Sequence, residues 1–270
     1  MSNVLDALVI VFYALSAVYF GARFFFKKEK TRTLAFLFLL LGLVTHSLDL
    51  IVFSLEHRHF PATNFVEAFS LLTCLTILLF VLIARKDEMD ALALVLLPIT
   101  VISIILSFLY RSGDQAATPV LRGGWIYIHI PLMILSVASL AISFLMAIMY
   151  LLQEKQLKSK HPAFFFDRLP SIEVCEDLSY RSLWFGFFLL TFGIITGSIW
   201  SKYLRDVYWS WDHKEVWSII TWALYAVLIH GRMLAAWRGR KAAYLAIVGF
   251  VFILFAFAGV SQVFKSYHSF

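Results

Sequence analysis

Residues 91–110 read Ala-Leu-Ala-Leu-Val-Leu-Leu-Pro-Ile-Thr-Val-Ile-Ser-Ile-Ile-Leu-Ser-Phe-Leu-Tyr, an unbroken stretch without a charged side chain. A helix needs about 20 such residues to cross a hydrocarbon core ~30 Å thick. Hydrophobic residues make up 61% of the 270-residue chain and charged residues only 15%. A soluble domain typically has about 45–50% apolar residues and about 25% charged residues. The stretch therefore predicts a membrane-spanning helix.

Similar apolar runs recur along the whole chain, and we expect about eight transmembrane spans. Each must be helical, because hydrocarbon offers no partner for an unpaired backbone N–H or C=O group. The sequence thus predicts an all-α, polytopic membrane protein that forms a single integral membrane domain over residues 1–270. The expected spans are 4–26, 33–55, 65–84, 91–110, 125–152, 182–200, 215–237 and 244–264.

The basic residues predict the orientation of these spans. The loops after the first, third, fifth and seventh spans, together with the adjoining span ends, hold 16 of the 23 lysines and arginines. The positive-inside rule therefore places both termini outside. The long loop 153–181 is then cytoplasmic and the segment 200–217 faces the exterior. The net charge of +6 is explained by these flanking loops, so we expect membrane lipid and not nucleic acid as the surrounding partner.

The segment 200–217 contains four tryptophans, Trp200, Trp209, Trp211 and Trp217, together with Asp212. Tryptophan favours both membrane interfaces, so an aromatic belt is one interpretation. A belt residue needs only the correct depth, however, and does not require several neighbouring tryptophans on one short segment. We therefore favour a flat aromatic platform for a planar apolar ligand, whose carboxylates would pair with nearby cations. The candidate cations are Arg122, Lys202, Arg205 and Lys214.

Three of the eight histidines are expected on the same outer face. His129 lies near the outer end of the fifth span, His268 follows the eighth span, and His213 lies among the tryptophans. Two neutral imidazoles on opposite sides of a planar macrocycle are what bis-histidine haem ligation requires. A solvated or capping role is the alternative for each histidine taken singly.

Two further histidines, His46 and His230, lie within predicted spans. An ionisable residue at membrane depth is costly and suggests a functional role. An interhelical hydrogen bond to Ser or Thr explains such a residue equally well. Both interpretations stay open, and Asp49, one helical turn from His46, would orient its ring in the first.

Several stretches resemble the CcsA/ResC-type cytochrome c assembly proteins and the related HemX-like membrane proteins. The resemblance is strongest from Arg122 to the C-terminus, and the tryptophan-rich stretch is its most specific part. The matching stretches are 124–129 (GWIYIH), 169–173 (LPSIE), 193–200 (GIITGSIW), 209–217 (WSWDHKEVW) and 222–232 (WALYAVLIHGR), with 63–67 (TNFVE) upstream.

The resemblance implies a haem-handling role. It implies that the segment 200–217 lies against haem, that His129 and His268 are the axial ligands of the haem iron, and that His230 matches a histidine in the span after the motif. His46 has no counterpart in the resemblance and is a local prediction. Haem b is then cargo, and a CcsB-type subunit and apocytochrome c are the partners.

Three positions depart from the family pattern. The family usually has Trp-Gly where this chain has Arg205 and Asp206, and Pro where it has His213. Part of the aromatic surface is therefore replaced, and an extra imidazole is present.

The main hypothesis is a haem-binding subunit of the bacterial inner membrane that presents haem on the outer face for attachment to apocytochrome c, as a component of a haem-lyase or synthase complex. A plastid homologue is the alternative source. Bound haem depends on the protein chiefly for orientation and electrostatics, so no catalytic side chain is assigned. The alternative function is a HemX-like regulator or scaffold of haem biosynthesis that acts through the loop 153–181. A haem-independent transporter ranks last.

Overall fold

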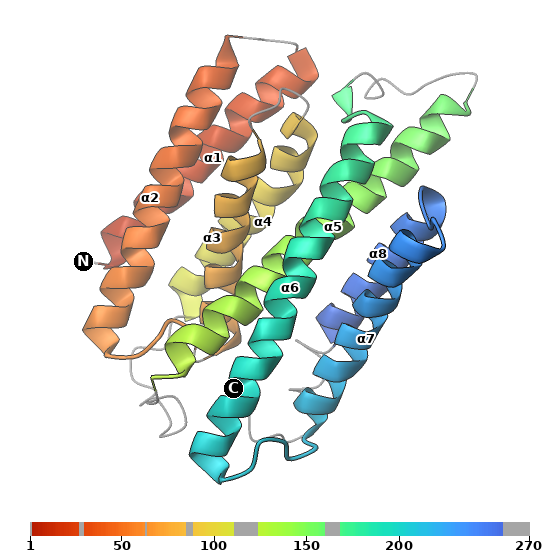
Figure 1. Ribbon diagram of the computed structural model, residues 1–270. Helices are drawn as coiled ribbons and strands as arrows, with labels where there is room; N and C mark the ends of the chain where they lie inside the picture. Colours follow the sequence, from red (N-terminus) through yellow and green to blue (C-terminus); the bar gives the residue numbers. More distant parts are fainter. Residues whose placement is uncertain are drawn as a thin grey trace. The chain divides into compact units, whose positions relative to one another are not determined.

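The structure, a computed structural model, describes residues 2–26, 30–62, 64–84, 89–110, 124–159 and 168–255. Within these residues every regular element is an α-helix, and no strand occurs among them (Figure 1). The helices are α1 (Ser2–Phe26), α2 (Thr31–His57), α3 (Phe65–Ile83), α4 (Asp90–Tyr110), α5 (Ile126–Leu157), α6 (Ile172–Arg205), α7 (His213–Leu234) and α8 (Arg240–Leu254).

Seven helices of the described chain, α1 to α7, are long and apolar enough to cross a membrane. The prediction of an all-α, polytopic membrane protein is therefore confirmed. The described part of α8 ends at Leu254, and its expected continuation to residue 264 lies outside the described residues. Eight spans and two outer termini stay predictions.

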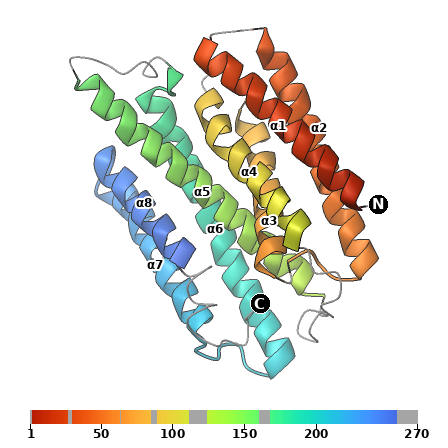
Figure 2. The ribbon, with the colours of Figure 1, turned by 180° about the vertical axis from the view of Figure 1, so that it is seen from behind.

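The helices pack as two compact units. Unit 1 comprises Met1–Arg122 with Phe164–Pro170, and unit 2 comprises Gly123–Ala163 with Ser171–Phe270. In unit 1, α1 packs against α2 and α4, and α3 packs against α4 (Figure 2). In unit 2, α5 and α6 form the most extensive pair, and α8 packs against α5 and α7. That the chain forms one integral membrane domain stays a prediction.

A row of serines joins α5 to α6. Their hydroxyls donate to backbone carbonyls of the facing helix, and the pairs are Ser136 to Gly186 O at 2.7 Å, Ser139 to Ser182 O at 2.8 Å and Ser143 to Ser179 O at 2.8 Å. Lipid tails are as apolar as leucine, so membrane helices associate through close packing and such interhelical bonds. The small residues on α6 allow the close approach that these bonds need.

The loop expected at 153–181 is shorter than the sequence predicted. Helix α5 continues to Leu157, and α6 begins at Ile172 behind Ser171, whose side chain accepts a bond from the Val174 N–H. Exposed side-chain pairs support these polar helix ends, as Lys158 with Glu154 at 2.6 Å shows. Hydropathy detects only the part of a helix that is apolar, so it does not distinguish these polar turns from a loop.

Close packing of α5 against α6 gives the first prediction. A Cβ added at Gly186 would lie 2.6 Å from Leu140 Cγ and 3.2 Å from the Ser136 carbonyl oxygen. We expect Gly186→Ala to destabilise the protein by about 1–3 kcal/mol, because overpacking forces side chains or backbone to shift. Thermal unfolding of the detergent-purified protein measures this. The control is Gly21→Ala, whose Cβ meets only Leu94 Cδ2 at an ordinary 3.7 Å; equal unfolding temperatures for the two variants would contradict the packing.

An ion pair between α1 and α4 gives the second prediction. Arg23 Nε lies 2.9 Å from Asp90 Oδ2, and the two side chains are only 8% and 15% exposed. Removing one partner leaves a poorly hydrated charge, so we expect Asp90→Asn to lower the free energy of unfolding by about 3 kcal/mol. Asp177→Asn breaks the exposed Arg181–Asp177 pair, whose side chains are 73% and 46% exposed, and should lower the unfolding temperature little. The reverse order of the two effects would refute the assignment.

Candidate functional site

The tryptophan-rich segment forms the end of α6, the loop 206–212 (the α6–α7 loop) and the start of α7. Helix α6 ends at Arg205, and the following residue, Asp206, adopts the left-handed conformation with φ of 59°. Helix α7 begins behind Asp212, whose carboxylate caps it by accepting the Lys214 N–H at 3.4 Å. The Asp212 side chain is 5% exposed, and it caps the start of α7.

Two departures from the family pattern lie where the backbone accepts either residue: Asp206 in place of Gly, and His213 in place of Pro. Glycine is the usual residue at a left-handed helix end, the conformation that Asp206 adopts. Proline is favoured in the first helical position, which His213 occupies, because no N–H is needed there. These two substitutions therefore preserve the course of the chain.

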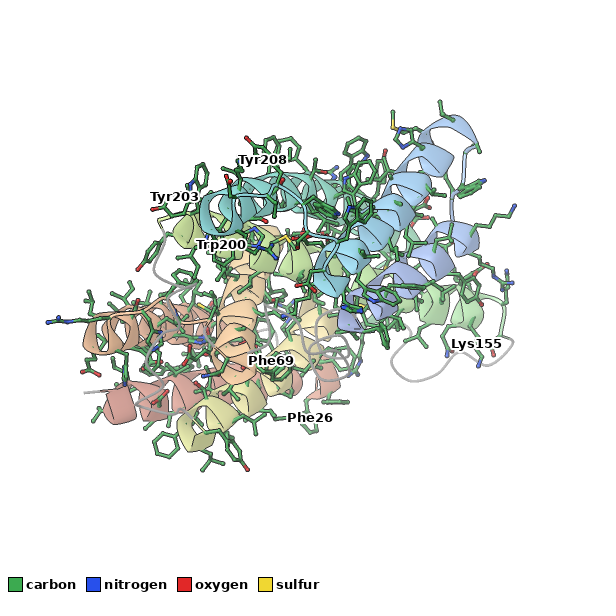
Figure 3. All side chains as sticks on the ribbon, turned by 90° about the horizontal axis from the view of Figure 1, so that it is seen from below. Phe26, Phe69, Lys155, Trp200, Tyr203 and Tyr208 are labelled. Atoms are coloured by element: carbon green, nitrogen blue, oxygen red, sulfur yellow. The ribbon has the colours of Figure 1, made fainter. Side chains whose placement is uncertain are left out.

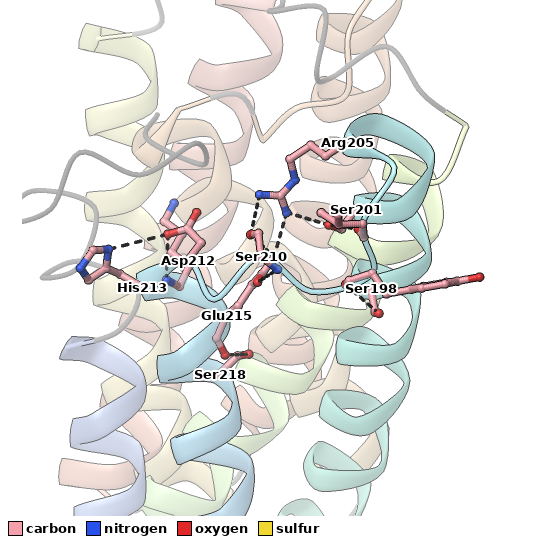
Figure 4. Close-up of polar contacts among 11 residues, drawn as sticks. Ser198, Ser201, Arg205, Ser210, Asp212, His213, Glu215 and Ser218 are labelled. Atoms are coloured by element: carbon pink, nitrogen blue, oxygen red, sulfur yellow. Dashed lines mark hydrogen bonds and ion pairs between the residues drawn. The ribbon is translucent and has the colours of Figure 1, made fainter.

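The third departure, Arg205, organises the loop through its guanidinium group (Figure 4). It donates to Glu215 Oε1, Ser201 Oγ and Ser210 Oγ, each at 2.8 Å. Glu215 also accepts the backbone N–H of Ser210 at 2.8 Å. The end of α6, the middle of the loop and the first turn of α7 are thus joined in one network.

Side chains of α6 also bind the loop backbone. Three of them donate to successive loop carbonyls: Lys202 Nζ to Asp206 O at 2.8 Å, Ser201 Oγ to Val207 O at 2.7 Å and Ser198 Oγ to Tyr208 O at 2.9 Å. Side chains of α6 therefore hold three consecutive residues of the short loop, Asp206 to Tyr208.

Two tryptophans belong to this loop. The rings of Trp209 and Trp211 lie 6.2 Å apart, with an angle of 85° between their planes. Trp209 is half-buried and Trp211 is 78% exposed. The geometry differs from the flat platform expected from the sequence, because neighbouring residues of a tight loop project in different directions.

The other two tryptophans of the segment pack within unit 2. Trp217 contacts Phe252 and Phe255 of the α8 segment, with ring centroids 6.1 and 4.9 Å away. Trp200 is 5% exposed and lies 5.7 Å from the His129 ring. Figure 3 shows Trp200 on the inner side of the α6 end, whereas Tyr203 and Tyr208 project outward.

His129 lies in the first turn of α5 and is half-buried. Its Nδ1 is 2.9 Å from the carbonyl oxygen of Gly193. A carbonyl oxygen only accepts, so Nδ1 donates this bond, and in the neutral imidazole the lone pair is then on Nε2. This is the arrangement in which a histidine ligates a metal, because the second bond fixes both tautomer and ring orientation.

Gly197 makes room for this ring, and Gly193 makes room for Met133. A Cβ at Gly197 would lie 2.7 Å from His129 Cε1, and one at Gly193 would lie 2.4 Å from Met133 Sδ. His129, Ser136 and Ser143 follow one another at intervals of seven residues on α5, and all three donate to carbonyls of α6. His129 thus lies at the N-terminal end of the serine row on α5.

The remaining predicted histidines lie elsewhere. His230 is exposed near the far end of α7, ~26 Å along the helix from His213 at 1.5 Å per residue, and its Nδ1–H donates to Ala226 O. In unit 1, the buried His46 ring has Nδ1 3.5 Å from the Tyr13 hydroxyl and Nε2 3.1 Å from the Ser70 hydroxyl. Haem ligation by His46 would have to displace one of these contacts. His268 lies outside the described residues.

Two of the cations expected to bind the carboxylates of a ligand pair with carboxylates of the chain itself. Arg205 pairs with Glu215, and Lys202 Nζ lies 2.6 Å from Asp206 Oδ1. Lys214 is half-buried beside the capping Asp212, and Arg122 lies outside the described residues. No group of three or more His, Cys, Asp or Glu residues in the described ranges is arranged to hold a metal ion.

Sequence reasoning did not find the serine row or the network around Glu215. The seven-residue spacing from His129 through Ser136 to Ser143 was a detectable signal for one face of α5. Nothing local marked Arg205 and Glu215 as partners, because they are separated by a loop.

Comparisons with known proteins identify the family of this chain. Residues 62–268 match the family model described as "Cytochrome C assembly protein". The cytochrome c biogenesis protein CcsA of Guillardia theta is 33% identical over 235 residues, which cover 80% of this chain and 78% of that protein. CcsA of Prochlorococcus marinus strain AS9601 is 29% identical in an alignment that covers 99% of this chain and 94% of that protein.

A solved structure has the same fold. The Cytochrome c Heme Lyase CcmF aligns with a TM-score of 0.62 and 18% sequence identity, over 95% of this chain and 46% of that chain. This chain thus spans about half the length of the lyase, and the likeness shows the fold alone. Because the family model matches well over half of the residues, the chain belongs to the cytochrome c assembly protein family.

Proposed function

We propose that this chain is a haem-handling subunit for cytochrome c assembly, which holds haem b as cargo and presents it for attachment to apocytochrome c. Family membership and the CcsA relatives support a role in cytochrome c assembly. The observation that favours haem handling by this chain is the state of His129. Its Nδ1–H donates to Gly193, so Nε2 has the lone pair that iron requires.

His129 is the first proposed axial ligand of the haem iron, and His268 is the second. Trp200 lies against the His129 ring, and Trp209 and Trp211 extend from the loop at the same end of unit 2. Asp212 and Trp217 support this site by starting α7 and packing against the α8 segment. His230, at the other end of α7, is a separate proposed haem contact, and His46 stays a prediction.

The chemistry of attachment involves the cargo and the apocytochrome. The two cysteine thiols of a CxxCH sequence add across the haem vinyl groups, so that each sulfur bonds to one vinyl carbon and the other carbon gains a proton. This chain would orient the haem and protect it from water without a catalytic side chain of its own. A CcsB-type subunit and apocytochrome c are the proposed partners, in a bacterial cytoplasmic membrane with the α6–α7 loop outside.

Absorption spectra of the purified protein with added hemin test the proposal. We expect a low-spin, six-coordinate spectrum for the wild type, and its loss or conversion to high spin in His129→Ala and in His268→Ala. The control is His213→Ala, which removes an imidazole whose side chain is 54% exposed and should leave the spectrum unchanged. Absence of hemin binding in every preparation would reject the haem site and place the regulatory alternative first.

The packing of Gly197 against His129 gives a separate prediction. In Gly197→Ala the new Cβ would lie 2.7 Å from the ring, so the imidazole must move and lose its bond to Gly193. Disturbing such a supporting bond typically weakens a metal site by about tenfold or more. Hemin titration followed in the Soret region should show this loss, with Gly124→Ala, whose Cβ meets nothing within 4 Å, as the control. Wild-type affinity in Gly197→Ala would show that the ring position is unimportant.

A further inference from the structure

The conformation of Trp211 requires an explanation. Its φ is 59° and its side chain is 78% exposed. A bulky residue in the left-handed region is a conformational outlier. Such strain persists only where the surrounding structure imposes it, and it is concentrated at functional positions. The exposed ring itself makes too little contact to impose this conformation, so the cause must lie in the backbone on either side.

The residues on both sides of Trp211 are fixed by the start of α7. The preceding residue, Ser210, donates its backbone N–H to Glu215 Oε2 at 2.8 Å and its hydroxyl to Glu215 Oε1 at 3.0 Å. The following residue, Asp212, is the cap of α7. Glu215 therefore holds one flank of the strained residue and the helix cap holds the other.

Arg205 connects this arrangement to α6. Its guanidinium contacts Glu215, Ser210 and Ser201 at the same time. A planar guanidinium can bridge several acceptors in a fixed geometry, which a lysine ammonium cannot reproduce. Arg205 is 23% exposed and Glu215 12% exposed, so water and salt weaken their attraction less than that of a surface pair.

The same loop contains a second ion pair that differs in this respect. Lys202 and Asp206 are 41% and 93% exposed. An exposed pair of this kind contributes little. The loop thus allows a comparison of two substitutions. The carboxylate can be replaced by an amide in the partly buried pair, at Glu215, or in the exposed pair, at Asp206.

We propose that Arg205 and Glu215 are positioning residues, whose ion pair fixes the α6–α7 loop in the conformation that displays Trp211 to a planar ligand. The pair touches the loop backbone and acts on the ligand through Trp211. The identity of that ligand as haem rests on the proposed function. The loop conformation itself does not depend on it, so the two can be tested separately.

Two measurements on the full-length protein in detergent test this inference. Hydrogen exchange followed by mass spectrometry reports the protection of residues 206–213, and hemin titration reports affinity. We expect Glu215→Gln and Arg205→Ala to speed exchange in this loop and to weaken hemin binding by about tenfold, which corresponds to ~1.4 kcal/mol. Arg205→Lys should fall between wild type and Arg205→Ala. Asp206→Asn is the matched control and should leave both quantities unchanged.

The outcomes separate positioning from a general loss of fold. Support requires that exchange and affinity change together while the unfolding temperature stays near that of the wild type. Faster exchange with wild-type affinity would make the pair purely structural and overturn the inference, as would unchanged exchange in both variants or an equal effect of Asp206→Asn. A wild-type protein that binds no hemin would overturn the proposed function, whereas the exchange data would still decide whether the pair fixes the loop.

Discussion

Inside a hydrocarbon core, the backbone N–H and C=O groups of a helix are already paired with one another, so two helices have few polar groups with which to bind each other. Helices α5 and α6 solve this by using the second lone pair of α6 carbonyls. Serine hydroxyls on α5 donate to these carbonyls, and His129 makes the same kind of bond at the end of the row. The interaction that packs the helices therefore also orients the imidazole and sets its tautomer, so that helix packing and the proposed ligand site depend on the same contact.

At the same end of unit 2, a different solution fixes the loop. A tight connection between two helices exposes backbone groups that the helices cannot pair, and here side chains of α6 and Glu215 of α7 bind them. At this end, the ion pair of Arg205 with Glu215 joins α6 to the first turn of α7. Polar contacts thus hold the backbone on both sides of the exposed Trp211.

Much of the fold could be predicted from the sequence, because apolar runs must become helices in a membrane. The extents of α5 and α6 could not, since the polar turns at Leu157 and Ile172 are held by capping and charged pairs that hydropathy does not register. The sequence predicted His129 on the same face as the tryptophan-rich segment, but the particular contact of its ring with Trp200, at 5.7 Å, came from the structure. The relative orientation of the Trp209 and Trp211 rings was not predictable, because ring directions in a loop depend on the φ and ψ angles of its backbone.

By itself, the sequence determined the all-α membrane class and the positions of the tryptophan-rich segment and of the histidines along the chain. Composition and the length of apolar runs decide these features, because burial of each segment in lipid depends on that segment alone. Only the tertiary structure decided which nitrogen of His129 donates to α6, which glycine makes room for its ring, and which acid partners Arg205. These features depend on distances between groups on separate helices, and such distances arise only when the helices pack.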